Sequence, residues 1–303
     1  MAEKYSFEVP QSIDGVRIDK VLAIETELSR SLLSQMFKDG LVKLNGKNVK
    51  QSEKVKFGDL VEAEISPNTD EVIEPQNIEF ETIYEDEHLL VINKSSGLVV
   101  HPGAGNKDNT LVNGLVYRYP EIVNVGESHR PGIVHRLDAG TSGLLVVAKS
   151  QEVYEKFVQM FSIHDVKRNY FALAWGKFAT SSGVIDASIG RSQTRATRMA
   201  VKENGKNART HYAVKNYYPD FDVTLLDVSL ETGRTHQIRV HCAAINHPVV
   251  GDKTYGGFRQ TIETDRIFLH AYELIFVHPV LNKEMKFKSL LPEDLQEILD
   301  RIS

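Results

Sequence analysis

The chain has 303 residues, of which 41% are hydrophobic and 25% are charged, so it can bury the core of one or two globular domains. No apolar run approaches the roughly 20 residues that a membrane-spanning helix needs, and the first residues lack the apolar stretch of a signal peptide. These features predict a cytoplasmic protein without a membrane partner. Cys242 is the single cysteine, which excludes a disulfide framework and a cysteine-based zinc site within one chain. Its small, apolar neighbours predict a buried side chain rather than a catalytic thiol.

The net charge of −5 argues at first against a nucleic-acid partner, but the charges are unevenly distributed. Residues 30–56 contain seven basic residues against two acidic ones, and residues 191–209 contain six against one. Between them, residues 61–87 contain ten acidic residues and no basic one. Because screening limits the reach of a charge to about 8–10 Å, a phosphate backbone responds to a local patch rather than to the net charge. Either basic stretch alone is typical of a solvated face, whereas both together, with the motifs below, indicate RNA binding.

Residues 12–66 have the pattern of a compact α/β module. Asp14 is a candidate N-cap for a helix with apolar residues at positions 18, 21 and 22. Ser29 is a candidate N-cap for a second helix, which Gly40 can end.

A hairpin and a strand are predicted next. Asn45-Gly46 lies between two short apolar runs, and because both residues readily adopt positive φ, the pair predicts a type I′ turn. Gly58-Asp59 marks another turn, and residues 60–65 predict a strand.

The order of these elements resembles the S-four RNA-binding domain, named for a protein of the small ribosomal subunit. The segments that carry the resemblance are Arg17 to Leu22, Leu28 to Ser31, Gly40 to Gly46, and Gly58-Asp59. In that family the second helix and the following loop face RNA. The resemblance therefore implies four RNA-binding residues in this module: Arg30, Gln35, Lys38 and Lys43.

The segment from Ser66 to Pro75 interrupts the periodicity and, with its acidic surroundings, is typical of a linker. We therefore expect two domains, residues 1–72 and residues 73–303. The second contains a helical pattern at residues 152–161 and several strand-like runs, among them residues 89–93, 143–148, 170–175 and 223–228. Strands and helices do not alternate strictly, which favours an α+β domain with a large, mainly antiparallel sheet flanked by helices and loops.

The densest motif of the chain is Gly-Ile-Val-His-Arg-Leu-Asp-Ala-Gly-Thr-Ser-Gly-Leu at residues 132–144. It places Asp138 in a loop before an apolar strand, where a carboxylate is a plausible nucleophile or base. The alternative, which this segment alone does not exclude, is a structural aspartate that caps its own turn through the backbone amides of Thr141 and Ser142.

A second motif is Glu-Thr-Gly-Arg-Thr-His-Gln-Ile-Arg-Val-His at residues 231–241. If it is a strand, its period of two places Thr235, Gln237 and Arg239 on one face and the residues between them on the other. Arginines with a glutamine between them suit recognition of carboxylate or phosphate. The alternative is a surface strand with its polar side chains in solvent.

A third motif, Val-Lys-Arg-Asn-Tyr-Phe-Ala-Leu at residues 166–173, leads from basic residues to an aromatic residue on a strand. The ring of Tyr170 can stack on a nucleobase, an interaction typically worth about 1–3 kcal/mol. The alternative is that Tyr170 is an ordinary core residue.

Together the three motifs resemble the RluA/RluD family of pseudouridine synthases, and the resemblance covers essentially the whole chain. The combination of His-Arg-Leu-Asp at 135–138 with Gly-Arg-Thr-His-Gln-Ile-Arg-Val-His at 233–241 is highly specific. Further matching segments are 84–94, 100–103 and 247–252. The chain departs from the family at Ser95, where proline is usual, and at Ala139-Gly140, where charged residues are common. The first position lies outside the chemical core, and the second is variable and can tune substrate fit.

The resemblance implies roles for individual residues. Asp138 would be the catalytic carboxylate, and Arg239 would pair with it and hold it ionised and oriented. Tyr170 would stack on the target uracil and assist proton handling. Arg136 would enter the RNA stack and stabilise the extruded nucleotide, because the reacting atoms are inaccessible in a stacked helix. Three further residues of the basic stretch and the second motif are candidates for RNA binding: Arg195, Arg198 and Arg234.

The expected reaction converts uridine to pseudouridine in large-subunit (23S) ribosomal RNA. It has no net redox change and uses no energy source or carrier, so we expect no cofactor and no metal. Whether Asp138 attacks the base or acts at the ribose is left open by the sequence. We expect a monomer without a protein partner.

Three alternatives compete with this interpretation. A protein kinase is suggested by His135-Arg136, but Leu137 separates that pair from the aspartate, and no glycine-rich ATP loop is present. A metal hydrolase is suggested by 11 histidines, but none forms His-Glu-x-x-His. A non-catalytic RNA-binding or ribosome-assembly protein would use the same basic stretches, yet would not need Asp138, Tyr170 and Arg239 together.

Overall fold

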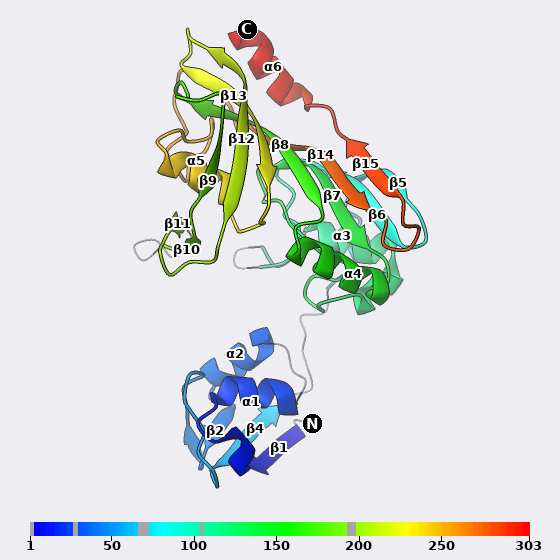
Figure 1. Cartoon of the computed structure of the whole chain (residues 1–303). Coiled ribbons are helices and arrows are strands. Elements are labelled where there is room, and N and C mark those ends of the chain that lie inside the picture. The colour runs from blue at the N-terminus through cyan, green and yellow to red at the C-terminus, as the bar shows by residue number, and fades with distance from the viewer. Residues whose placement is uncertain (1–2, 27–29, 66–72, 104–105, 193–197) are drawn as a thin grey trace. The chain divides into compact units, whose positions relative to one another are not determined.

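The computed structural model describes residues 3–26, 30–65, 73–103, 106–192 and 198–303 (Figure 1). The chain divides into two compact units, Met1–Val72 and Ile73–Ser303, and each has its own hydrophobic core.

The N-terminal unit packs two helices, α1 (Ile18–Glu25) and α2 (Arg30–Lys38), on a small sheet. The sheet is antiparallel, in the order β1 (Glu3–Glu8), β4 (Leu60–Ile65), β2 (Val42–Leu44) and β3 (Lys47–Asn48), and a short 3-10 helix (Gln11–Ile13) follows β1. Apolar positions of the helices and the sheet close into one core, whose buried members include Ile18, Leu22, Leu33, Val42 and Val61.

The turn predictions for this unit are confirmed, and one capping prediction is wrong. Asn45 and Gly46 have φ of 51° and 75°, as a type I′ turn requires, and Gly40, with φ of 69°, follows the end of α2. Asp14 does not cap α1, because its carboxylate accepts a hydrogen bond from the backbone of Phe57 instead. The predicted cap Ser29 lies outside the described residues.

The second unit is built on a large twisted sheet (Figure 1). Its strand order is β5-β6-β7-β14-β8-β13-β12-β9, and β15 pairs with the far half of β14. Among the described strands of this sheet only β7 and β14 run parallel, so the predicted α+β fold with a mainly antiparallel sheet is confirmed. The strands are β5 (Glu81–Glu85), β6 (Leu89–Lys94), β7 (Ser142–Ala148), β8 (Lys167–Trp175), β9 (Ser182–Asp186), β12 (Arg209–Tyr218), β13 (Val223–Leu230), β14 (Leu269–Val277) and β15 (Glu284–Lys288).

The remaining elements lie around this sheet. A two-stranded ribbon of β10 (Ile189–Arg191) and β11 (Met199–Val201) extends from the β9–β12 end of the sheet (Figure 1). The helices are α3 (Leu111–Arg118), a 3-10 helix (Pro120–Asn124), α4 (Gln151–Ser162), α5 (Gln237–Ala244) and α6 (Glu293–Ile302). None of the described helices is both long and apolar enough to span a membrane.

Side chains on the two faces of β8 pack into two different hydrophobic cores. Tyr170, Ala172 and Ala174 join the main core, which also contains residues of α3 and α4, whereas Leu173 and Trp175 join a second core with α6. Successive side chains of a strand point to opposite faces, so β8 presents one face to each layer. The face that carries Tyr170 also carries the functional cavity described below.

The parallel pairing of β7 with β14 depends on a glycine. Gly143 has φ of 115°, and a Cβ at this position would collide with the backbone of Ala271. The motif after Asp138 therefore needs a residue without a side chain where the parallel strands come together.

Candidate active site

Asp138 lies in the loop that leads into β7, at the wall of a cavity of about 660 Å³. Its side chain is 15% exposed, and Leu137 beside it is buried in the core. Among the described residues its carboxylate contacts Arg239 and His236, and it accepts no hydrogen bond from the backbone of Thr141 or Ser142. The alternative of a self-capping structural aspartate is therefore not what this loop adopts.

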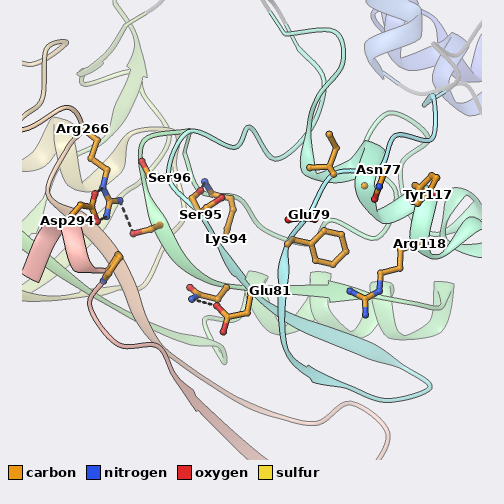
Figure 2. Close-up of a pocket in the computed structure, with 16 residues that line it drawn as sticks. Asn77, Glu79, Glu81, Lys94, Ser95, Ser96, Tyr117, Arg118, Arg266 and Asp294 are labelled. Atoms are coloured by element: carbon orange, nitrogen blue, oxygen red, sulfur yellow. Dashed lines mark hydrogen bonds and ion pairs between the residues drawn. The ribbon is translucent and has the colours of Figure 1, made fainter.

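Two basic side chains, Lys94 and Arg266, hold the loop and line a second cavity of about 790 Å³ (Figure 2). Lys94 is 1% exposed, burial lowers its pKa to about 7, and its amino group donates to the carbonyl oxygens of Ser95, Leu98 and Ala139. Arg266 donates to the Ser142 hydroxyl at 2.9 Å and pairs with Asp294. Both side chains bind residues that closely follow Asp138 in sequence, so they restrict the positions that its carboxylate can occupy.

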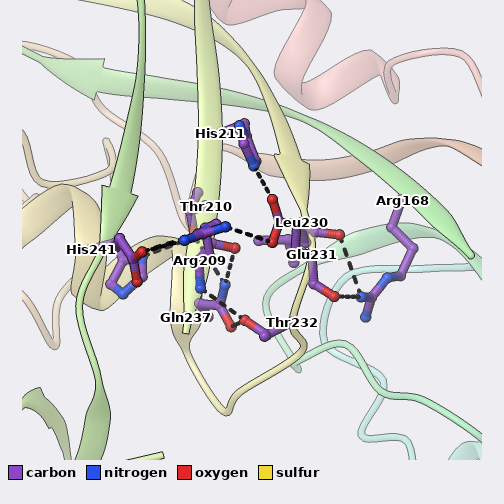
Figure 3. Close-up of polar contacts among 10 residues, drawn as sticks. Arg168, Arg209, Thr210, His211, Leu230, Glu231, Thr232, Gln237 and His241 are labelled. Carbon is purple, nitrogen blue, oxygen red and sulfur yellow. Dashed lines mark hydrogen bonds and ion pairs between the residues drawn. The ribbon is translucent and has the colours of Figure 1, made fainter. Parts of the chain in front are cut away.

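The segment predicted as a possible strand at 231–241 is instead a turn followed by α5. His236 has φ of 59° immediately before the helix, so the alternating faces expected for Thr235, Gln237 and Arg239 do not exist. Gln237 binds the backbone of Arg209 and Arg234 and the hydroxyls of Thr210 and Thr232, which fixes this turn from inside (Figure 3).

Arg239 lies between two aspartates. Its Nη1 is 3.5 Å from Oδ2 of Asp138, whereas its Nε and Nη2 donate to both carboxylate oxygens of Asp252 at 2.7 and 3.1 Å. Asp252 is 0% exposed and also accepts from the backbone amides of Thr254 and Tyr255. Two parallel hydrogen bonds to a fully buried carboxylate fix the plane of the guanidinium. Asp252 is thus the main partner of Arg239, and Asp138 meets the remaining edge of the guanidinium.

His236 also reaches Asp138. Its Nε2 is 3.9 Å from Oδ1 of Asp138, and its Nδ1 is 2.9 Å from the hydroxyl of Tyr255. Burial lowers the pKa of His236 despite the opposing effect of Asp138, so the ring is predominantly neutral at neutral pH.

Tyr170 lines the same cavity from β8 and is 4% exposed. Burial raises the pKa of its hydroxyl, so the phenol stays protonated at neutral pH. Asp138, Tyr170 and Arg239, which are far apart in sequence, therefore line one cavity.

The predicted RNA-binding residues fall into three groups. Arg136 and Arg234 are exposed and line the cavity, where Arg136 lies 3.2 Å from Nε2 of His101 and Arg234 donates to the carbonyl of Asn207. Lys38 and Lys43 are exposed on the N-terminal unit, and Arg198 is partly buried before β11. Arg195 and the side chains of Arg30 and Gln35 lie outside the described residues.

Metal and thiol chemistry find no support in the described part of the chain. No group of three or more His, Cys, Asp or Glu is placed there to hold a metal ion. Cys242 is buried in α5, and burial raises the pKa of its thiol to about 12, as expected for a core residue.

Two residues with clear positions in the site received no role from the sequence, namely Asp252 and Lys94. Both lie in segments that matched the family, 247–252 and 84–94, which was the available signal. What the sequence did not show is that each is buried against the Asp138 loop or its arginine.

Comparisons with known proteins agree with this geometry. The family model described as RNA pseudouridylate synthase matches residues 88–244, and the S4 domain model matches residues 16–61. The ribosomal large subunit pseudouridine synthase D of Yersinia pestis is 42% identical over 311 residues, which cover 98% of this chain and 94% of the relative. The protein of the same name from Pseudomonas aeruginosa is 44% identical over 305 residues, covering 96% and 93%.

A solved structure is similar as well. Human RNA Pseudouridylate Synthase Domain Containing 1 aligns with a TM-score of 0.56 and 28% identity, over 75% of this chain and 96% of that one. The chain therefore belongs to the RNA pseudouridylate synthase family of enzymes and carries an S4 domain before its catalytic unit.

Proposed function

We propose that this enzyme isomerises specific uridines of large-subunit ribosomal RNA to pseudouridine, with Asp138 as the catalytic carboxylate. The observation that carries the assignment of Asp138 is its position: a carboxylate at the wall of a cavity, beside a guanidinium that Asp252 holds in place. The choice of RNA is supported by the names of the relatives, which cover nearly the whole chain.

The arrangement suits the reaction. The bond between the ribose and the uracil nitrogen breaks, the base turns, and its carbon 5 joins the ribose while that carbon loses a proton and the nitrogen gains one. A carboxylate close to both reaction partners serves as nucleophile or base, and Tyr170 offers a flat apolar surface on which the uracil is held. A cavity of about 660 Å³ accommodates one extruded nucleotide.

Binding to the RNA is assigned to the exposed cations. We assign Arg136 and Arg234 at the cavity rim, and the partly buried Arg198 near β11, to RNA phosphates, and Lys38 and Lys43 to the same role on the N-terminal unit. We assign Arg30, Gln35 and Arg195 to the same role from the sequence. The enzyme acts without a cofactor, as a monomer, in the cytoplasm, where its substrate is assembled.

The test is direct. Ribosomal RNA purified from a strain that lacks the gene is incubated with the protein, and pseudouridines are mapped at nucleotide resolution. New pseudouridines at discrete positions of the large-subunit RNA support the proposal. Tight RNA binding without any new pseudouridine would instead support the non-catalytic RNA-binding alternative.

A further inference from the structure

Arg168 is a buried cation that forms no ion pair with any acidic residue in the described part of the chain. It lies on β8, is 6% exposed, and its Nη2 donates weakly to the backbone carbonyls of Leu230 and Glu231 at 3.5 and 3.3 Å (Figure 3). Its guanidinium carbon lies 5.1 Å from the centre of the Phe161 ring, and its Nε is buried with no hydrogen-bond partner. Within the described residues no Asp or Glu forms an ion pair with it, which is unusual because buried charges are normally paired.

Three other arginines of this unit form ion pairs with carboxylates, and Arg136 and Arg234, which line the cavity without one, are exposed to solvent. Arg239 pairs with Asp252, Arg130 pairs with Glu127, and Arg209 pairs with Asp186. Arg168 therefore stands apart as a buried guanidinium whose charge no described carboxylate offsets.

Two titratable neighbours of Arg168 are neutral at neutral pH. Tyr170 lies two positions further along β8, on the same face, and its hydroxyl stays protonated. His135 is half-buried and neutral, because burial of its ring and the charge of Arg168 lower its pKa to about 3. Arg168 is thus a positive charge that no described carboxylate pairs with, at the wall of the cavity that Asp138 also lines.

The backbone makes room for this charge. A Cβ at Gly233 would lie 2.7 Å from Nη1 of Arg168, closer than a real Cβ approaches a neighbour. The glycine of the Gly-Arg-Thr-His motif therefore lets the guanidinium lie against the turn that precedes α5.

The reaction supplies a transient negative charge in this cavity. When the bond between the ribose and the uracil nitrogen breaks, its electron pair stays with the uracil and spreads over the nitrogen and the two carbonyl oxygens. The charge disappears when carbon 5 bonds to the ribose, loses its proton, and the nitrogen is protonated. A fixed cation in a water-poor cavity stabilises such a charge far more than a cation in solvent does.

We propose that Arg168 is a further catalytic residue, whose guanidinium stabilises the negative charge on the uracil while the glycosidic bond is broken. The inference rests on the proposed function and deepens it. A backbone phosphate is the less favoured ligand, because Arg168 is buried whereas Arg136 and Arg234 are exposed at the rim, where a phosphate has easier access.

The test compares two substrates under single-turnover conditions with saturating enzyme. One is a transcript of the rRNA segment that contains a mapped uridine, and the other is the same transcript made with 5-fluorouridine. Fluorine at carbon 5 withdraws electrons and stabilises the uracil anion, so its departure needs less help from the protein. Because fluorine also blocks the loss of the proton, the rate of consumption of the nucleoside is followed for both RNAs.

Arg168→Met removes the charge and keeps the length of the side chain. We expect its rate constant on the uridine RNA to fall by roughly 100- to 1000-fold, as when other groups that stabilise a developing charge are removed. On the 5-fluorouridine RNA we expect the decrease in rate constant relative to wild type to be smaller by a factor of about ten or more. The dissociation constant for RNA and its salt dependence should stay within about twofold of wild type, because Arg168 does not bind a phosphate in this proposal.

Two further variants keep the inference testable if Arg168→Met does not fold. Arg168→Lys retains a charge without the planar fork, and Gly233→Ala displaces the guanidinium without removing it. We expect the rate constant on the uridine RNA to fall less in both variants than in Arg168→Met. In both, the fall should again be smaller on the 5-fluorouridine RNA. Arg259→Met is the matched control, because Arg259 also lies over an aromatic ring, that of Trp175, but is exposed and does not line the cavity.

The outcomes are distinct. Equal losses on both RNAs, or unchanged rate constants in all the Arg168 and Gly233 variants that fold, would overturn the inference. An unchanged rate constant with weaker binding and a salt slope reduced by about one would identify a bond to phosphate and would overturn it too. If wild-type protein leaves the uridine unchanged, the proposed function itself has failed, which is seen before any variant is compared.

Discussion

In the N-terminal unit the basic side chains of Lys38 and Lys43 are exposed, whereas in the second unit Arg239 and Arg168 are buried around the cavity of Asp138. An exposed cation on a flexible stem contributes little fixed geometry, and its attraction to phosphate is weakened by salt. A buried guanidinium has a restricted position, and its electrostatic interaction with a neighbouring group is little weakened by water or salt. Our proposals thus give cationic side chains two different purposes: affinity for RNA in the N-terminal unit and control of charge during chemistry in the second unit.

Among the buried arginines of the second unit, Arg239→Met is expected to have the largest effect on stability and activity. The change leaves Asp252 buried without its cation, which typically costs about 3–5 kcal/mol in the free energy of unfolding. It also removes the group beside Asp138, so activity should fall by roughly 100-fold or more at saturating RNA. Urea unfolding and the single-turnover assay measure the two losses.

A double variant separates these losses. Arg239→Met combined with Asp252→Leu replaces the buried ion pair by apolar groups, which should restore most of the stability. Activity should stay low, because the partner of Asp138 is still absent. Recovery of activity along with stability would mean that Arg239 serves the fold alone.

A smaller effect is expected on the stability of the protein at acidic pH, through His135. His135 accepts a hydrogen bond from the backbone amide of Val146, and its pKa is about 3 in the folded protein against about 6.5 when unfolded. Below pH 6.5 the unfolded chain therefore binds a proton that the folded protein does not. The free energy of unfolding should fall by up to about 1.4 kcal/mol per pH unit as pH drops from 6.5 toward 3.

Urea unfolding at pH 7.5, 6 and 5 measures this slope. His135→Gln can still accept a hydrogen bond from the Val146 amide. Its free energy of unfolding should fall less steeply with decreasing pH than that of wild type, by up to about 1.4 kcal/mol per pH unit. The burial of His270, whose pKa is lowered to about 4, contributes a similar slope in both proteins and so cancels in the comparison. Equal slopes would contradict the burial of His135.

The smallest effect is expected on the exposed side of the comparison. Lys38→Gln with Lys43→Gln should weaken RNA binding and reduce the salt slope by about 0.7–0.9 for each phosphate that is no longer neutralised. The rate constant at saturating enzyme should not change. Lys4→Gln with Lys20→Gln removes the same charge from exposed positions of the same unit and serves as the control. Equal slopes in the two double variants would refute a specific role for Lys38 and Lys43.

Local patterns predicted much of the fold. The pair Asn45-Gly46 predicts its hairpin because the turn needs positive φ at both residues, and the apolar run at 143–148 predicts β7 because a strand buried on both faces needs one. The sheet order was not predictable, since it depends on pairings such as β8 with β14 between segments about a hundred residues apart.

The site was predictable only in part. Asp138, Tyr170 and Arg239 were named from their motifs, and they line one cavity. Residues 237–240 alternate polar and apolar side chains, which favours a strand, yet the chain turns at His236 and forms α5. The helix places Arg239 against Asp252, a tertiary interaction that no local pattern contains.

The central claim is that the carboxylate of Asp138 performs the reaction while other parts of the chain hold the RNA. Asp138→Asn keeps the shape of the side chain and removes its charge. The measurement is the pseudouridine formed on the mapped rRNA, together with the dissociation constant for the same RNA. We expect no detectable product, with a dissociation constant within about twofold of wild type. Product formation by Asp138→Asn at a rate near that of wild type would contradict the claim.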